Sequence, residues 1–386
     1  MKDDRNSCEL GKAAKKPRIE AEDTADRLSS LPYLILHHIL EFLDTKSVVQ
    51  TSVLSRAWRS TWKEVSVLNF QSDSFDRYSS FQTYVDKVLS LRHPGVLSVV
   101  EYSDNENREE RDGDLFVKVI EHAITHDTKH LVMDLSNGKE FQPSSAFSFL
   151  FHTVSDCKLE SLALRCVILD SEFTSAGFRM LTTLTLFNSC MTTPGMGDVD
   201  PFSGFPCLKH LTLIASIGLD YFEDVTASFK ISGSQLITLE MAIVTSSKIE
   251  ICAPKLRDFG LQHDLGSLNF SSLILPSLKH AEIGISDKTN RMEADKESMA
   301  RRLMFLFQGL SAAKGILLHS KTIQILGTID SAILEQQRSP FTRLKTLIVE
   351  GDAVPYQLID YFLEGSTTVV EPTLYRVKSI GETILE

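Results

Sequence analysis

Two histidines four residues apart, His122 and His126, stand beside Glu121 and are the chain's nearest approach to a metal site. On a helix, residues four apart share a face, so these side chains could coordinate a divalent cation. The same spacing is typical of a solvated polar helix face, and the cysteines form no zinc-binding pattern. We therefore predict no metal at these histidines.

Nucleophilic or phosphate-handling chemistry has no better candidate. The sequence contains no Gly-x-Ser-x-Gly, no Gly-x-x-x-x-Gly-Lys-(Ser/Thr) and no His-Glu-x-x-His motif. Gly195-x-Gly197 is an isolated pair in a turn, and none of the six cysteines forms a Cys-x-x-Cys pair. A hydrolase or transferase would need a clustered nucleophile and base. We predict a non-catalytic protein without a cofactor, in a reducing compartment.

Binding chemistry is concentrated in residues 26–70, which hold both tryptophans of the chain, Trp58 and Trp62. Pro32 suits a helix start, and Ser55 can cap a helix that carries both tryptophans. Between them Asp44 or Thr45 can cap a second helix. The first helix carries an apolar stripe at spacings of three and four, made of Ile35, Leu36, Ile39, Leu40 and Leu43. Three helices in so few residues bury little surface, so we expect docking to another protein rather than a self-contained core.

This segment resembles the plant form of the F-box. The matching residues are Asp26, Arg27, Leu28, Ser29, Leu31, Pro32, Ile39, Leu40, Phe42, Leu43, Thr51, Ser52, Val53, Leu54, Ser55, Arg56, Trp58, Arg59 and Trp62. The chain departs from that family's pattern at Tyr33 and Asp44. The resemblance implies binding to the Skp-type adaptor of a cullin-RING (SCF) ubiquitin ligase. The residues expected at the adaptor face or supporting it are Leu31, Pro32, Leu36, Ile39, Leu40, Leu43, Val53 and Trp58.

A second pattern, Leu-x-x-Leu-x-Leu, recurs through the rest of the chain. Its first positions are 159, 181, 208, 236, 256, 278, 313 and 344, with gaps of 22, 27, 28, 20, 22, 35 and 31 residues. Most gaps are near the period of roughly 20–29 residues typical of leucine-rich repeats. The last two apolar positions of each unit alternate on a short strand and point into one core.

The repeats depart from the regular type eight residues after the first leucine, where Asn or Cys is usual. The residues there are Val167, Ser189, Ser216, Val244, Asp264 and Ser286. We therefore predict an uneven arc. The fold class is α/β: a three-helix F-box, then an irregular leucine-rich-repeat solenoid whose curved sheet has helices and loops outside. The alternative is an α/β domain with scattered strand–helix units.

The expected domains are a disordered tail (1–25), the F-box (26–70), a helical linker and N-terminal cap (71–126), the repeats (127–350) and a C-terminal cap (351–386). The segments 248–256 and 307–314 also resemble units of the plant F-box/leucine-rich-repeat family. That resemblance implies a substrate receptor of an SCF ligase, in which the repeats bind a target protein for ubiquitination. The alternatives are a non-degradative scaffold and a degraded family member without a ligase role.

Target binding is expected on the outward strand positions of the repeats. These are Arg165, Thr185, Phe187, His210, Thr212, Glu240, Gln262, His280 and Glu282. They share no single chemical character, so they specify no class of ligand, and each alone fits an ordinary solvated strand face. We expect a peptide or protein rather than a small molecule.

Charge and hydropathy restrict the partners further. The net charge of −11 argues against a nucleic-acid groove. The longest uncharged run, residues 180–197, is broken by Pro and Gly, so we predict no membrane span. In the tail, Lys15, Lys16 and Arg18 resemble a short nuclear import signal. The expected location is the nucleus, the cytoplasm or both.

Overall fold

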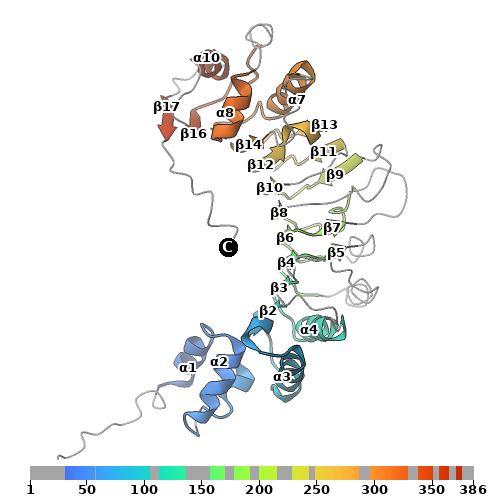
Figure 1. Ribbon diagram of the computed structural model, residues 1–386, viewed down its shortest axis with the longest axis vertical. Helices are drawn as coiled ribbons and strands as arrows, with labels where there is room; N and C mark the ends of the chain where they lie inside the picture. Colours follow the sequence, from blue (N-terminus) through green and yellow to red (C-terminus); the bar gives the residue numbers. More distant parts are fainter. Residues whose placement is uncertain are drawn as a thin grey trace, which may run out of the picture.

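The computed structural model describes residues 31–56, 58–104, 113–135, 157–169, 178–191, 200–214, 228–242, 248–286, 296–328, 338–350, 356–364 and 371–375. The predicted tail and its basic residues lie outside this set, as do the first residues of the predicted F-box. The described residues form a mixed α/β structure: an N-terminal helical unit joined to one large parallel sheet, with further helices along it (Figure 1).

The N-terminal unit contains fewer α-helices than the sequence predicts. It comprises α1 (Tyr33–Leu40) and α2 (Thr45–Gln50), then the 3-10 turns η1 (Thr51–Val53) and η2 (Thr61–Glu64). Asp44 caps α2 as expected, accepting the backbone N–H of Ser47 at 2.9 Å. The predicted third α-helix is wrong: Trp62 lies in η2 and Trp58 in the turn before it. Ser and Thr in this stretch compete for backbone hydrogen bonds, which disfavours a regular helix.

The large sheet has twelve parallel strands in chain order. They are β1 (Val67–Gln71), β2 (Val99–Ser103), β3 (His130–Asp134), β4 (Ser161–Arg165), β6 (Thr183–Phe187), β8 (His210–Ile214), β10 (Thr238–Ala242), β12 (Asp258–Asp264), β14 (His280–Ser286), β15 (Gly315–Leu318), β16 (Thr346–Glu350) and β17 (Glu371–Tyr375). All eight Leu-x-x-Leu-x-Leu units supply a strand, from β4 to β16, which confirms the strand prediction. The strands form one sheet rather than scattered units, and this arrangement is consistent with a leucine-rich-repeat-like fold.

The register explains the repeat. Leu184 pairs with Leu162 on one side and with Leu211 on the other, so equivalent leucines stack in rows across the strands. These inward residues are buried, whereas the alternating residues face outward. In a parallel sheet neighbouring strands lie about 4.8 Å apart, so stacked leucines are in direct contact. Each repeat therefore buries its apolar face only through its neighbours.

The remaining elements lie along this sheet. Two small parallel sheets are formed by β9 (Ser228–Ser232), β11 (Lys248–Cys252) and β13 (Phe270–Ile274), and by β5 (Ile168–Leu169) and β7 (Cys190–Met191). The helices are α3 (Tyr78–Leu91), α4 (Gly113–Thr125), α7 (Lys296–Gly309), α8 (Ser320–Leu326) and α10 (Tyr356–Glu364), with 3-10 turns η3 (Ser72–Ser74) and η4 (Leu265–Ser267). In Figure 1, α4, both small sheets and α7 lie on the same, outer side of an open arc.

One buried apolar cluster runs through the whole described structure, from Leu36 in α1 to Phe362 in α10. The sequence predicts only helices between residues 71 and 126, yet β2 lies there and pairs with β1. The helical unit is tied to β1 because the Thr45 hydroxyl accepts the Asn69 backbone N–H at 2.6 Å. The helical unit and the sheet thus share one core.

Close packing of α7 on β13 depends on Gly309. A Cβ at this position would lie 2.6 Å from the Cβ of Leu273, whereas a Cβ at Gly260 would meet only the Glu240 side chain, at 3.5 Å. We expect Gly309→Ala to lower the free energy of unfolding by about 1–3 kcal/mol through overpacking. Gly260→Ala, the control, should change it by less than about 0.5 kcal/mol. Urea denaturation checks both values, and equal effects would contradict this account.

Candidate protein-interaction surfaces

His122 lies in the last turn of α4 and His126 directly follows the helix. The His122 and His126 rings stack with centroids 4.0 Å apart, and His126 Nδ1 lies 2.8 Å from the carbonyl of His122. Burial, with the charges of His126 and Arg92, lowers the pKa of His122 to about 4. The described part of the chain contains no group of three or more His, Cys, Asp or Glu side chains that could hold a metal ion. The pair closes the end of a helix.

The adaptor residues predicted from the sequence divide into two groups. Leu36, Leu40 and Trp58 are buried and Leu31 is half-buried, so they pack the helical unit itself. The exposed members are Pro32, Ile39, Leu43 and Val53. The buried members, Leu36, Leu40 and Trp58, have almost no surface with which to contact a partner directly.

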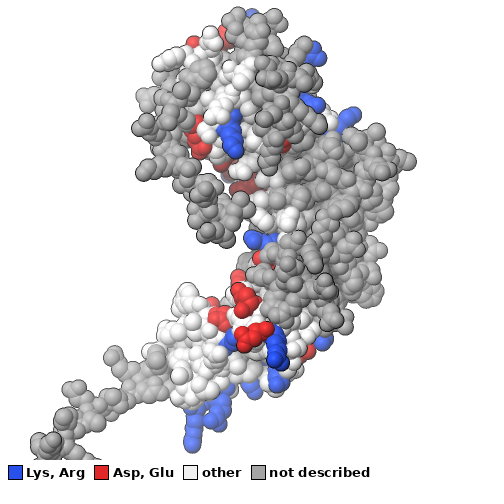
Figure 2. Space-filling model, in the orientation of Figure 1, with Lys and Arg blue, Asp and Glu red and all other residues white. Residues whose placement is uncertain are grey.

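The most exposed apolar side chains of the helical unit include three that the sequence analysis did not select. Leu34 is 78% exposed, Phe42 77% and Leu54 64%, beside Val53 at 85%. These four residues are called the apolar patch below. Figure 2 shows this end of the molecule as mostly uncharged, with Lys and Arg at its lower margin. Helix α1 is apolar around most of its circumference, and that signal could have identified Leu34, because such a helix requires cover on every side.

Tyr33, a departure from the family pattern, has a defined partner. Its hydroxyl donates to the Glu64 carboxylate, and His93 Nδ1 lies 3.1 Å from the other oxygen of Glu64. Hydrogen bonds from Tyr33 and His93 hold the pKa of Glu64 below its usual value. The contact links α1 to η2 and so fixes the helix that presents Leu34.

The predicted target residues all lie on the sheet face opposite the leucines. Thr185, Phe187 and Thr212 are half-buried, and the exposed ones are Arg165, His210, Glu240, Gln262, His280 and Glu282. The register brings Arg165 beside Phe187, where its guanidinium lies 4.3 Å from the ring centroid. Arg165 also pairs with Asp134 at 3.5 Å. The structure therefore gathers these residues on one continuous face.

This face is richer in carboxylates than the sequence analysis recognised. Besides Glu240 and Glu282, its outward positions include Glu101, Asp134, Asp258 and Glu350. Figure 2 shows acidic side chains beside β2 and β3 and again in the hollow near α8. Arg165 is the one Lys or Arg at an outward strand position among the described residues of the large sheet.

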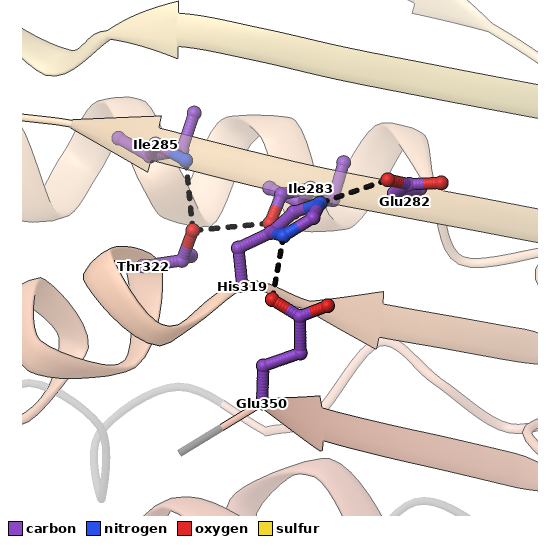
Figure 3. Close-up of polar contacts among 6 residues, drawn as sticks. All are labelled: Glu282, Ile283, Ile285, His319, Thr322 and Glu350. Atoms are coloured by element: carbon purple, nitrogen blue, oxygen red, sulfur yellow. Dashed lines mark hydrogen bonds and ion pairs between the residues drawn. The ribbon is translucent and has the colours of Figure 1, made fainter. Parts of the chain in front are cut away.

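A three-residue cluster at the C-terminal end of the face was also missed. His319 lies between two carboxylates: Nδ1 is 2.7 Å from Glu350 and Nε2 is 2.8 Å from Glu282 (Figure 3). Ionised carboxylates only accept, so the imidazolium form alone can donate to both. No periodicity indicates this contact, because His319 precedes α8 and Glu350 ends β16.

Behind this cluster, Thr322 joins α8 to β14. Its hydroxyl accepts the backbone N–H of Ile285 at 2.7 Å and donates to the carbonyl of Ile283 at 3.0 Å (Figure 3). Ser189 acts similarly between repeats, accepting the backbone N–H of Val167 at 3.2 Å. Ser189 thus satisfies a backbone group at a position where regular repeats have Asn or Cys, whereas Thr322 lies one residue beyond that position in its own unit.

Thr322→Val should destabilise the fold. The valine keeps the shape of the buried side chain but leaves the Ile285 N–H without its partner, at a loss of about 1–3 kcal/mol, whereas the Ile283 carbonyl still accepts the His319 N–H at 3.0 Å. Thr322→Ser retains the hydroxyl and should recover most of that loss. Thermal unfolding of both variants checks this, and a valine variant as stable as the wild type would contradict the assigned role.

Comparisons with known proteins bear on these surfaces. Residues 28–70 match the F-box domain. F-box/LRR-repeat protein 13 of Arabidopsis thaliana is 27% identical, over 96% of this chain and 82% of the relative. A putative F-box/LRR-repeat protein of the same plant is 25% identical, over 92% of this chain and 71% of its own length. An F-box/FBD/LRR-repeat protein, also from Arabidopsis thaliana, is 25% identical, over 78% of this chain and 68% of its own length.

Among the helices that the structure describes, none has the length and apolar character needed to cross a membrane.

Proposed function

Since its F-box domain and its relatives make this chain a member of the plant F-box/leucine-rich-repeat family, we propose that it is the substrate-recognition subunit of an SCF-type ubiquitin ligase. In this proposal the large sheet is a leucine-rich-repeat solenoid. The helical unit docks a Skp-type adaptor and through it a cullin, and the outward sheet face binds the target.

The apolar patch is the observation that carries the proposal. Leu34, Phe42, Val53 and Leu54 are each more than 60% exposed within one short segment. Fully burying one such side chain is worth about 1.5–3 kcal/mol, so leaving four in water is unfavourable unless a partner covers them. The fully buried core of a stable protein interface is more apolar than the rest of the protein surface. An adaptor that covers this patch accounts for their exposure.

The proposed mechanism is proximity. The chain contributes no bond-making step; it binds and orients a target near the ubiquitin-loaded E2, which raises the effective concentration of the reacting groups. The twelve-stranded sheet is roughly 50 Å across at about 4.8 Å per strand. One buried apolar cluster connects the helical unit to the far end of the sheet.

Truncating the apolar patch should abolish adaptor capture without unfolding the chain. The variant combines Leu34→Ala, Phe42→Ala, Val53→Ala and Leu54→Ala. If two of these residues each contribute about 2 kcal/mol, affinity falls more than about 100-fold. Because the four side chains are exposed, the melting temperature by circular dichroism should stay near that of the wild type. Pull-down with a purified Skp-type adaptor measures the capture.

The matched control truncates exposed apolar residues elsewhere, at Leu91, Val96, Met180 and Tyr356, each at least half exposed. It should capture adaptor normally. A folded wild type that captures no adaptor, or a patch variant that captures it fully, would overturn the docking claim. Trp58→Ala is unsuitable, since Trp58 is 4% exposed and its loss would cost about 3–5 kcal/mol of stability.

The alternative is a scaffold that binds adaptor and partner without degradation. A reconstituted complex with cullin, RING subunit, E1 and E2 distinguishes the two. Ubiquitin on a bound protein supports the receptor, whereas stable capture with no transfer to any bound protein supports the scaffold.

A further inference from the structure

A row of cations lies at one edge of the large sheet. The residue immediately before each of β12, β14, β15 and β16 is Arg or Lys: Arg257, Lys279, Lys314 and Lys345. These four residues, all exposed, are called the basic edge below. They occupy the second position of four successive Leu-x-x-Leu-x-Leu units, so the repeat itself sets them in line.

Backbone hydrogen bonds fix their spacing. The N–H of Lys279 donates to the carbonyl of Arg257 at 2.8 Å, and that of Lys314 to Lys279 at 2.8 Å. The N–H of Lys345 donates to Lys314 at 2.7 Å. The four residues are therefore direct neighbours, about 4.8 Å apart and about 14 Å from first to last.

The positive charge of this edge is not neutralised within the described structure. None of the four cations makes an ion pair with a described residue, although the chain as a whole carries a net charge of −11. Lys129 occupies the same register position before β3, and there it pairs with Glu160 of the next repeat at 3.0 Å. Adjacent like charges repel, so the basic edge is a place where an anionic partner gains binding energy.

We propose that the basic edge binds an acidic, Asp- and Glu-rich segment of the target protein. This rests on the proposed function, in which the sheet face receives the target. Carboxylates of such a segment would pair with the four cations, and its other residues would lie over the adjoining face.

A nucleic acid fits this surface less well. The face beside the basic edge carries Asp258, Glu282 and Glu350, and the whole chain is acidic. A uniformly charged phosphate backbone would meet those carboxylates and be repelled. A peptide carries charge residue by residue, so it can place acidic side chains at the edge and neutral or basic ones on the face.

The test measures binding of a fluorescent peptide, in which Glu alternates with Ser, to the full chain by anisotropy. The same peptide with Gln in place of Glu, and oligodeoxythymidylate, are the comparison probes. We expect the Glu peptide to bind best, with affinity falling as salt rises. Replacing all four cations of the basic edge by Gln should weaken it about tenfold, because each exposed ion pair is worth roughly a factor of two.

A control variant with the same charge change replaces Lys87, Lys118, Lys129 and Lys158 by Gln and should bind the Glu peptide as the wild type does. Equal losses in both variants, equal binding of the Gln peptide, or tighter binding of the oligonucleotide would each overturn the proposal. Adaptor capture is measured in parallel on the same variants. Capture without Glu-peptide binding would sink this inference alone, whereas peptide binding without capture would sink the proposed function alone.

Discussion

Stacking of inward leucines between parallel strands is the contact on which the rest of the structure depends. A five-residue strand such as β6 presents Leu184 and Leu186 on one side, too little apolar surface for a core. Placed between Leu162 and Leu211, Leu184 is completely buried. A strand is therefore stable only beside its neighbours in the sheet. The packing of its leucines also determines the position of the outward residues between them.

The same constraint makes interaction surfaces out of ordinary side chains. The stacked leucines fix the register between strands. A residue type that recurs at the same outward or edge position of successive repeats therefore forms a row across the sheet. Lysines separated by more than thirty residues in the sequence, such as Lys279 and Lys314, become neighbours in this way. Carboxylates from β14 and β16 reach the same histidine for the same reason.

Sequence periodicity predicted the repeated strands and some of the buried residues. The eight leucine units gave the strands from β4 to β16, and the stripe of α1 identified its buried residues, Leu36 and Leu40. Periodicity did not distinguish the residues that pack the helical unit from those exposed to a partner. Helix α1 is apolar on nearly all sides, and only the fold decides which side is covered. Trp58 and Trp62 look helical at a spacing of four, yet both are buried without sharing a helix. His319 was beyond prediction, since its two partners are 37 and 31 residues away.

In the proposed receptor role, the continuous core between the helical unit and the sheet would influence which lysines of a target are modified. Because the helical unit and the sheet share one core, the place of each strand in the sheet sets its distance from the helical unit. A target held one strand further along is carried about 4.8 Å away from the adaptor end. In that proposed role, two proteins bound over β6 and over β14 would present different parts of their surfaces to the same E2, so the geometry of binding would help to select the modified residue.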